Sequence, residues 1–200
     1  SDSAYFVAGN STSWTPPITT GNAFGGAAGS EFGKSLAGLG DFNGDGYSDY
    51  AVGAASDDSG ATNSGRVHIY GGNPAMTVGA TIGSVTGGAA NEAFGTDVSS
   101  AGDVNGDGRT DLFVIGNTGA SLVFGTEGTA TRNINFQVPA DYKVLGGGGI
   151  GDFNGDGYDD FTISLGDSTE SKTYVVFGRD MPSNATYDFS VLKDPNIAME

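Results

Sequence analysis

Short apolar runs recur along the chain, and each is bounded by polar or glycine-rich stretches. One kind of run follows an acidic segment and reads Tyr50-Ala-Val-Gly53, Leu112-Phe-Val-Ile115 and Phe161-Thr-Ile-Ser164. A second kind ends in glycine and covers residues 4–9, 66–71, 121–125 and 173–178. Runs this short, rich in β-branched and aromatic residues, are typical of buried strands. No long stretch has the i, i+3, i+4 apolar spacing of a helix, so the pattern predicts an all-β chain.

The runs repeat at a period of about 50–60 residues, which in an all-β chain is typical of a propeller or a related array. The glycines that close the second kind of run are Gly9, Gly71, Gly125 and Gly178. They divide the chain into approximate repeats 10–71, 72–125 and 126–178. Residues 1–9 read as the closing strand of a preceding blade, and residues 179–200 as the start of a further repeat or a terminal segment. We therefore expect a β-propeller-like array of about three four-stranded blades.

Three blades are too few to close a ring, because propellers have about four to eight. An open array also leaves sheet edges exposed, which natural proteins avoid. Two interpretations follow from the sequence. The chain is either an excerpt of a longer propeller or a protomer completed by other copies of itself through its open sheet edges, as a closed oligomer or a filament.

An acidic nine-residue loop precedes the first kind of strand in every repeat. The loops span residues 41–49, 103–111 and 152–160 and share the pattern Asp-x-Asn-Gly-Asp-Gly-x-x-Asp. Oxygen donors fall at positions 1, 3, 5 and 9, and the variable position 7 would offer its backbone carbonyl. Such a hard-oxygen set suits Ca²⁺. The predicted ligands of about three Ca²⁺ ions are Asp41, Asn43, Asp45, Tyr47 and Asp49; Asp103, Asn105, Asp107, Arg109 and Asp111; and Asp152, Asn154, Asp156, Tyr158 and Asp160.

The first half of this pattern also begins an EF-hand loop. An EF-hand needs a bidentate Glu at position 12, where this chain has Val52, Val114 and Ile163. A strand rather than a second helix follows each loop, so the sequence argues against an EF-hand.

Charge and composition exclude several classes of function. The formal net charge is −16, which argues against a nucleic-acid partner because phosphate binding needs a basic surface. One histidine and no cysteine exclude a Cys-His pair and a two-histidine zinc site. His68 lies inside an apolar strand, where a structural role is expected. No apolar run reaches the ~18 residues of a membrane span.

The loops and their surroundings resemble the FG-GAP repeat. Phe32-Gly33 and Phe94-Gly95 each precede a loop by nine residues, and Gly53-Ala54-Ala55 follows the first loop. The third repeat has Lys143-Val144 in place of Phe-Gly. FG-GAP repeats build the seven-bladed headpiece of integrin α subunits and occur in many secreted bacterial proteins. The resemblance implies a propeller whose loops bind Ca²⁺ at the positions given above.

The sequence therefore predicts a Ca²⁺-stabilised structural or adhesive module, extracellular or at the cell surface, without catalytic activity. Its partner would be a protein or glycan ligand, or other copies of itself. The alternative is a propeller scaffold that forms part of a secreted carbohydrate-active enzyme, because a fold does not settle a function.

Overall fold

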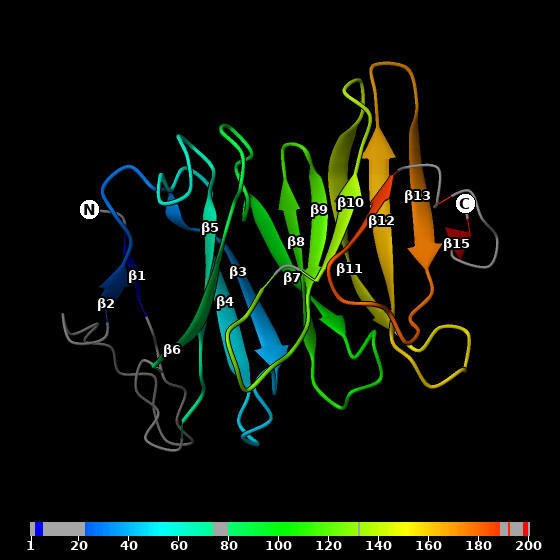
Figure 1. Cartoon of the computed structure of the whole chain (residues 1–200), viewed down its shortest axis with the longest axis horizontal. Helices are drawn as coiled ribbons and strands as arrows, with labels where there is room; N and C mark the ends of the chain where they lie inside the picture. Colours follow the sequence, from blue (N-terminus) through cyan, green and yellow to red (C-terminus); the bar gives the residue numbers. More distant parts are fainter. Residues whose placement is uncertain are drawn as a thin grey trace, which may run out of the picture.

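The computed structural model describes residues 3–5, 23–73, 80–131, 133–188, 192 and 198–199. In these residues every regular element is a β-strand, and there is no α-helix. Figure 1 shows the strands as upright sheets set side by side across the molecule. The prediction of an all-β fold is confirmed.

The first large sheet, called blade 1 here, is antiparallel and has the order β3-β4-β5-β6. Its strands are β3 (Phe32–Gly40), β4 (Asp49–Ala54), β5 (Arg66–Tyr70) and β6 (Thr81–Thr86). The outermost strand, β6, comes from the connector that leads to the next repeat. Four strands per repeat, with one drawn from the connector, are as the sequence predicts.

Blade 2 contains β7 (Asp97–Gly102), β8 (Asp111–Gly116), β9 (Gly119–Val123) and β10 (Ile134–Gln137). A fifth strand, β14 (Ala185–Asp188), pairs in parallel with β10. The sequence did not predict this strand in blade 2, because its segment follows the third repeat. It covers the outer edge of β10, and covering an edge is one way in which proteins prevent unwanted strand pairing.

Blade 3 has the order β11-β12-β13-β15. It consists of β11 (Lys143–Gly151), β12 (Asp160–Gly166), β13 (Ser171–Val176) and the short β15 (Ala198–Met199). Near the N-terminus, β1 (Ser3–Tyr5) and β2 (Ala23–Gly25) form a separate antiparallel pair. The strand expected over residues 4–9 is described only for its first two residues, and the others lie outside the described residues.

The cores lie between the blades rather than inside one sheet. Side chains alternate along β8, so that Leu112 and Val114 pack against blade 1 while Phe113 and Ile115 pack against blade 3. The first strands of the three blades are neighbours, since β7 contacts both β3 and β11. The described sheets do not close into a barrel, and the fold is an incomplete β-propeller-like array as expected.

Candidate functional site: three acidic loops

Each acidic loop joins the first and second strands of its blade. The loops follow β3, β7 and β11, and all three lie along the lower edge of the molecule in Figure 1. Neighbouring loops are joined through the backbone, because Thr110 N–H donates to Asp41 O at 3.2 Å and Asp159 N–H donates to Asp103 O at 3.0 Å. The three predicted sites are therefore arranged as a row.

The aspartate at position 1 organises the backbone of each loop. In the first loop, Asp41 Oδ1 accepts the N–H groups of Gly44 (2.8 Å) and Asp45 (3.0 Å), and Oδ2 accepts that of Gly46 (2.9 Å). The same bonds recur in the loops that begin at Asp103 and Asp152. The glycines at positions 4 and 6 have positive φ in all three loops, a conformation that glycine adopts without steric cost.

Positions 3 and 5 are bonded to each other. Asn43 Oδ1 accepts the N–H of Asp45 at 2.9 Å, while Asn43 Nδ2 donates to Asp45 Oδ2 at 2.9 Å. Asp45 Oδ1 in turn accepts the N–H of Tyr47 at 2.9 Å. The second and third loops have the same arrangement. The aspartate at position 5 is solvent-exposed in every loop, which leaves its oxygens accessible.

The aspartate at position 9 is buried and lies at the base of the loop. Asp49, Asp111 and Asp160 are 2%, 0% and 0% exposed. In each, Oδ2 accepts the N–H of position 2, at 2.9, 3.0 and 2.9 Å. Oδ1 accepts the N–H of a glycine after the third strand of the blade, Gly72, Gly125 or Gly178, at 2.8, 2.9 and 2.8 Å. This carboxylate therefore ties the loop to the end of a distant strand.

The glycine partners correct one alignment of the repeats. The sequence pattern aligned Gly71 with Gly125 and Gly178 as equivalent positions of the repeats. In the structure it is Gly72 that makes the hydrogen bond equivalent to those of Gly125 and Gly178. The three bonded glycines are then evenly spaced, at 53 residues each. That even spacing is a signal from which the sequence could have identified them.

Burial changes the acidity of two of these carboxyls. Burial raises the pKa of Asp111 to about 7, although the Gly125 and Val104 N–H groups act in the opposite direction. Burial also raises the pKa of Asp49, again opposed by backbone N–H donors. A cation close to either carboxyl would lower its pKa by favouring the charged form.

The donor chemistry of the loops fits a hard cation such as Ca²⁺. Every side-chain donor is a carboxylate or amide oxygen, and a carboxylate has about four lone-pair sites, so accepting N–H groups leaves capacity for an ion. As the side chains lie, no group of three or more His, Asp or Glu in the described part of the chain could hold a metal ion. The aspartates engage their own backbone instead. The fifteen predicted ligands thus stay a prediction.

Position 7 differs between the loops and was expected to offer only its carbonyl. The Arg109 side chain lies against the preceding loop, because a Cβ atom placed on Gly44 would be 3.0 Å from Arg109 Nε. Its Nη2 pairs with Glu127 Oε1 at 2.8 Å. Tyr158 lies in the same way against Gly106. The side chain at position 7 therefore joins neighbouring loops, which sequence reasoning missed.

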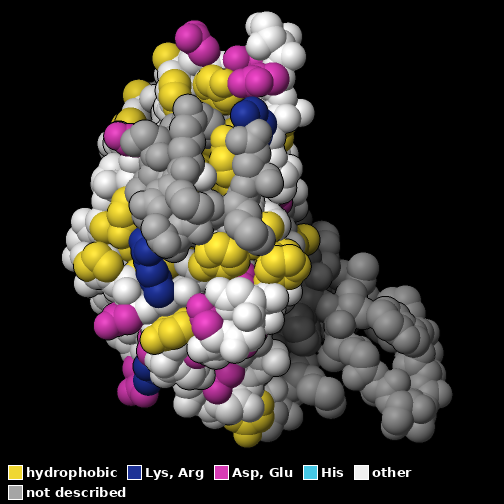
Figure 2. Space-filling view, turned by 90° about the vertical axis from the view of Figure 1, so that its right-hand side faces the viewer, with side chains coloured by type: hydrophobic (Ala, Val, Ile, Leu, Met, Phe, Trp, Pro, Cys, Tyr) yellow, Lys and Arg dark blue, Asp and Glu magenta, His cyan; other side chains and the backbone are white. Residues whose placement is uncertain are grey.

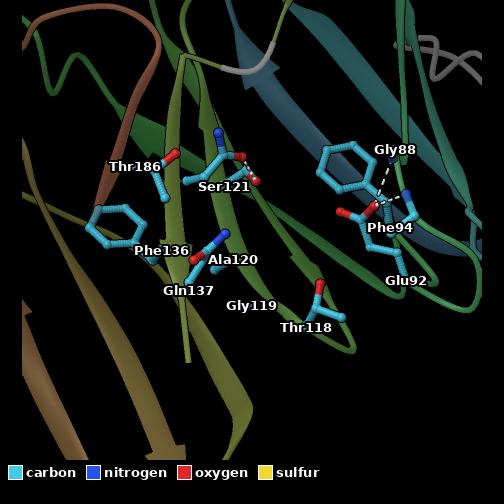
Figure 3. A pocket seen from close by; sticks show the side chains of 12 residues that line it. Gly88, Glu92, Phe94, Thr118, Gly119, Ala120, Ser121, Phe136, Gln137 and Thr186 are labelled. Atoms are coloured by element: carbon cyan, nitrogen blue, oxygen red, sulfur yellow. Dashed lines mark hydrogen bonds between the residues drawn. The ribbon is translucent and has the colours of Figure 1, made fainter. Parts of the chain in front are cut away.

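A second candidate site is a cavity of about 310 Å³ beside β9 and β10 (Figure 3). Glu92 lies at one side, and its Oε2 accepts the N–H groups of Gly88 and Ala89 at 2.7 and 3.0 Å. Hydroxyl and amide side chains line much of the remainder, including Ser121, whose Oγ donates to Asn135 Oδ1 at 3.0 Å. Among the described residues, no Lys or Arg lines the cavity. This lining suits an uncharged polar ligand better than an anion.

Comparisons with known proteins agree with the loops and strands described above. In the described residues, no helix is both long and apolar enough to span a membrane. A search of curated proteins finds no match. The model of the FG-GAP repeat family matches residues 32–70, and that of the FG-GAP-like repeat matches residues 103–163. Together the two segments make up half of the 200 residues. The chain therefore belongs to the FG-GAP repeat family.

Proposed function

We propose that this chain is a Ca²⁺-stabilised extracellular interaction module without catalytic activity. The observation that carries the proposal is the threefold recurrence of one hydrogen-bonded loop, with side-chain oxygens at positions 1, 3 and 5 and a buried aspartate at position 9. Three different stretches of sequence thus build the same acidic loop.

Charge supports a role for cations. Nine of the 24 acidic residues lie at positions 1, 5 and 9 of the three loops. Three Ca²⁺ ions would change the formal net charge from −16 to −10. Since the loops are adjacent, cations would relieve repulsion within and between them, and ion binding would add to the free energy of unfolding.

Two arguments support an extracellular location: the Ca²⁺ affinity expected of exposed loops, and the usual location of proteins with FG-GAP repeats. Exposed Ca²⁺ loops in extracellular modules work at about 10⁻⁴–10⁻³ M, where free Ca²⁺ is high. FG-GAP repeats are typical of extracellular or surface proteins and generally act as structural or interaction modules. The partner would be a protein or a glycan. The hydroxyl, amide and aromatic side chains that line the cavity beside β9 and β10, together with Glu92, favour a glycan at that place.

Thermal unfolding tests the proposal. We expect the Tm to rise with added Ca²⁺ over about 10⁻⁴–10⁻³ M and to fall when a chelator is present. Mg²⁺ at equal concentration should raise the Tm less, because it demands stricter octahedral geometry and releases its water reluctantly. A variant with Asp45→Ala, Asp107→Ala and Asp156→Ala is the matched control, since these exposed side chains lie at position 5 of each loop. A wild-type Tm that Ca²⁺ leaves unchanged would overturn the proposal.

A further inference from the structure

The three acidic loops share their internal hydrogen bonds, but the first two differ in the side chains that approach them from the following blade. Two positions make these contacts, position 7 and position 8 of the next loop. Beside the first loop they are Arg109 and Thr110, and beside the second they are Tyr158 and Asp159. Neighbours at equivalent places therefore bring different charges to two loops whose own side-chain oxygen donors are the same.

Position 7 places a positive charge beside the first loop. The Arg109 guanidinium lies against Gly44, because a Cβ atom placed on that glycine would be 3.0 Å from Nε and 3.5 Å from Nη2. The Nε atom is buried and has no hydrogen-bond partner among the described residues. At the second loop, a Cβ atom placed on Gly106 would be 2.6 Å from Tyr158 Cε1. The first loop thus has a guanidinium where the second has a neutral phenol.

Position 8 places a negative charge beside the second loop. Asp159 Oδ2 accepts the N–H of Asp103, which is the position-1 aspartate of that loop, at 2.8 Å. At the first loop the equivalent residue is Thr110, and a Cβ atom placed on Gly40 would be 2.8 Å from its Oγ1. The second loop therefore has a carboxylate where the first has a neutral hydroxyl.

The chain after the third strand of each blade reduces this contrast without cancelling it. Glu127 lies beside the first loop, and its Oε1 pairs with Arg109 Nη2 at 2.8 Å. In the next blade the equivalent stretch contains Arg179 and Asp180, which together carry no net charge. With positions 7 and 8 included, the neighbours of the first loop carry no net charge, and those of the second carry one net negative charge.

This difference of one charge acts in acidic surroundings. The chain has 24 Asp and Glu against 8 Lys and Arg, and Figure 2 shows acidic side chains exposed in the lower part of the molecule, where the loops lie. A unit charge about 8–10 Å from a divalent ion in water changes the affinity for that ion by about four- to sixfold before salt screening. Residues outside a loop can therefore set its affinity while its own donors stay the same.

We propose that the predicted Ca²⁺ sites are not equivalent, and that the second loop binds Ca²⁺ more tightly than the first because of the two residues that approach each from the following loop. The Asp159 carboxylate favours a cation at the second loop, whereas the Arg109 guanidinium disfavours one at the first. The inference rests on the proposed function, which supplies the ion. The row of loops then fills in steps as the Ca²⁺ concentration rises, with the first loop after the second.

Amide NMR of the full chain, titrated with Ca²⁺, observes the two loops separately. Gly46 and Gly108 are the reporters, because each occupies position 6 and donates its N–H to the position-1 aspartate of its own loop, at 2.9 and 2.8 Å. In about 10 mM KCl, the Gly108 signal should complete half of its change at a Ca²⁺ concentration at least about threefold lower than the Gly46 signal. In about 1 M KCl the two concentrations should converge, since the Debye length falls from about 30 Å to about 3 Å.

Two substitutions that exchange the neighbours of the loops test the cause. Arg109→Tyr, which copies position 7 of the third loop, should lower the half-change concentration of Gly46 by at least about threefold. Asp159→Thr, which copies position 8 of the second loop, should raise that of Gly108 by at least about threefold. Lys34→Tyr is the matched control, because it removes the same charge as Arg109→Tyr but near the other end of β3. It should change either concentration by less than about twofold.

The outcomes separate this inference from the proposed function. Equal half-change concentrations for the two glycines in wild type, or a lower one for Gly46, would overturn the inference and leave the proposed function standing. A difference that neither salt nor the two substitutions alter would overturn its electrostatic cause. No change at either glycine up to about 10⁻² M Ca²⁺ would overturn the inference and the proposed function together. The expected order with a Tm indifferent to Ca²⁺ would support the inference and overturn the proposed stabilisation.

Discussion

The aspartate at position 9 is the residue that ties each loop to its blade. The sequence assigned it only as a metal ligand, together with the donors at positions 1, 3 and 5. In the structure it is buried, and its two oxygens accept N–H groups from the loop and from the end of the third strand. It therefore also has a structural role, which is to hold the loop against the end of the third strand.

A pair of substitutions in the third loop separates the two roles. Asp160→Asn removes a charged acceptor that holds Phe153 and Gly178, and should lower the free energy of unfolding by about 1–3 kcal/mol. The measurement is the denaturant midpoint in chelator. Asp156→Asn, at exposed position 5, should change that value by less than about 0.5 kcal/mol. Equal losses in the two variants would contradict the structural role of Asp160.

His68 offers a test by pH. Burial lowers its imidazole pKa, the Arg66 charge lowers it further, and Asp57 opposes both. Its Nε2 is buried and has no hydrogen-bond partner among the described residues, and the ring packs against Phe32 and Tyr70.

Because the folded-state pKa lies below the unfolded value of about 6.5, the unfolded state binds more protons as the pH falls below that value. Wild type should therefore lose stability as the pH falls from about 7 through 6.5, in addition to the losses caused by its carboxylates. His68→Phe should lose less over the same range, as read from the denaturant midpoint at each pH. If the denaturant midpoints of wild type and variant fell in parallel with pH, His68 would not contribute to the pH dependence of stability.

At the scale of the element, the contact between blades depends on position 2 of each loop. Phe42 is buried between blades 1 and 2, whereas Phe153 occupies the same position of the third loop and is exposed. Phe42→Ala should lower the free energy of unfolding by about 3–5 kcal/mol, because it leaves a cavity in a packed core. Phe153→Ala should lower the free energy of unfolding by less than about 1 kcal/mol, measured at a concentration where the chain is monomeric. Similar costs for both would contradict the stacking of the blades described here.

The sequence was informative about elements where its pattern is local. The Asp-x-Asn-Gly-Asp-Gly loops, the strands after them and the three later strands that end in glycine could be read directly, because turn chemistry and short apolar runs act over a few residues. The parallel pairing of β14 with β10 could not, because the partners are about fifty residues apart and residues 185–188 show only weak alternation. The roles of Arg109 and Tyr158 were missed because they depend on which loop lies beside which.

At the scale of the molecule, the blades and loops share one arrangement. The second strand of blade 2 packs between blades 1 and 3. Each acidic loop lies beside the next, so the three loops form a row along one edge. The expected incomplete β-propeller-like array of about three blades is confirmed. The prediction that cations neutralise the row stays a prediction.

Calorimetric titration of the chain with Ca²⁺ tests the central claim most directly, because it counts the ions as well as detecting them. The account predicts about three ions per chain, and about two when Asp107→Ala removes an exposed donor from the second loop. Leu145→Ser, which changes an exposed side chain outside the loops, should still bind about three. No heat of binding up to about 10⁻³ M Ca²⁺, or a stoichiometry that Asp107→Ala leaves unchanged, would contradict the assignment of the loops as Ca²⁺ sites.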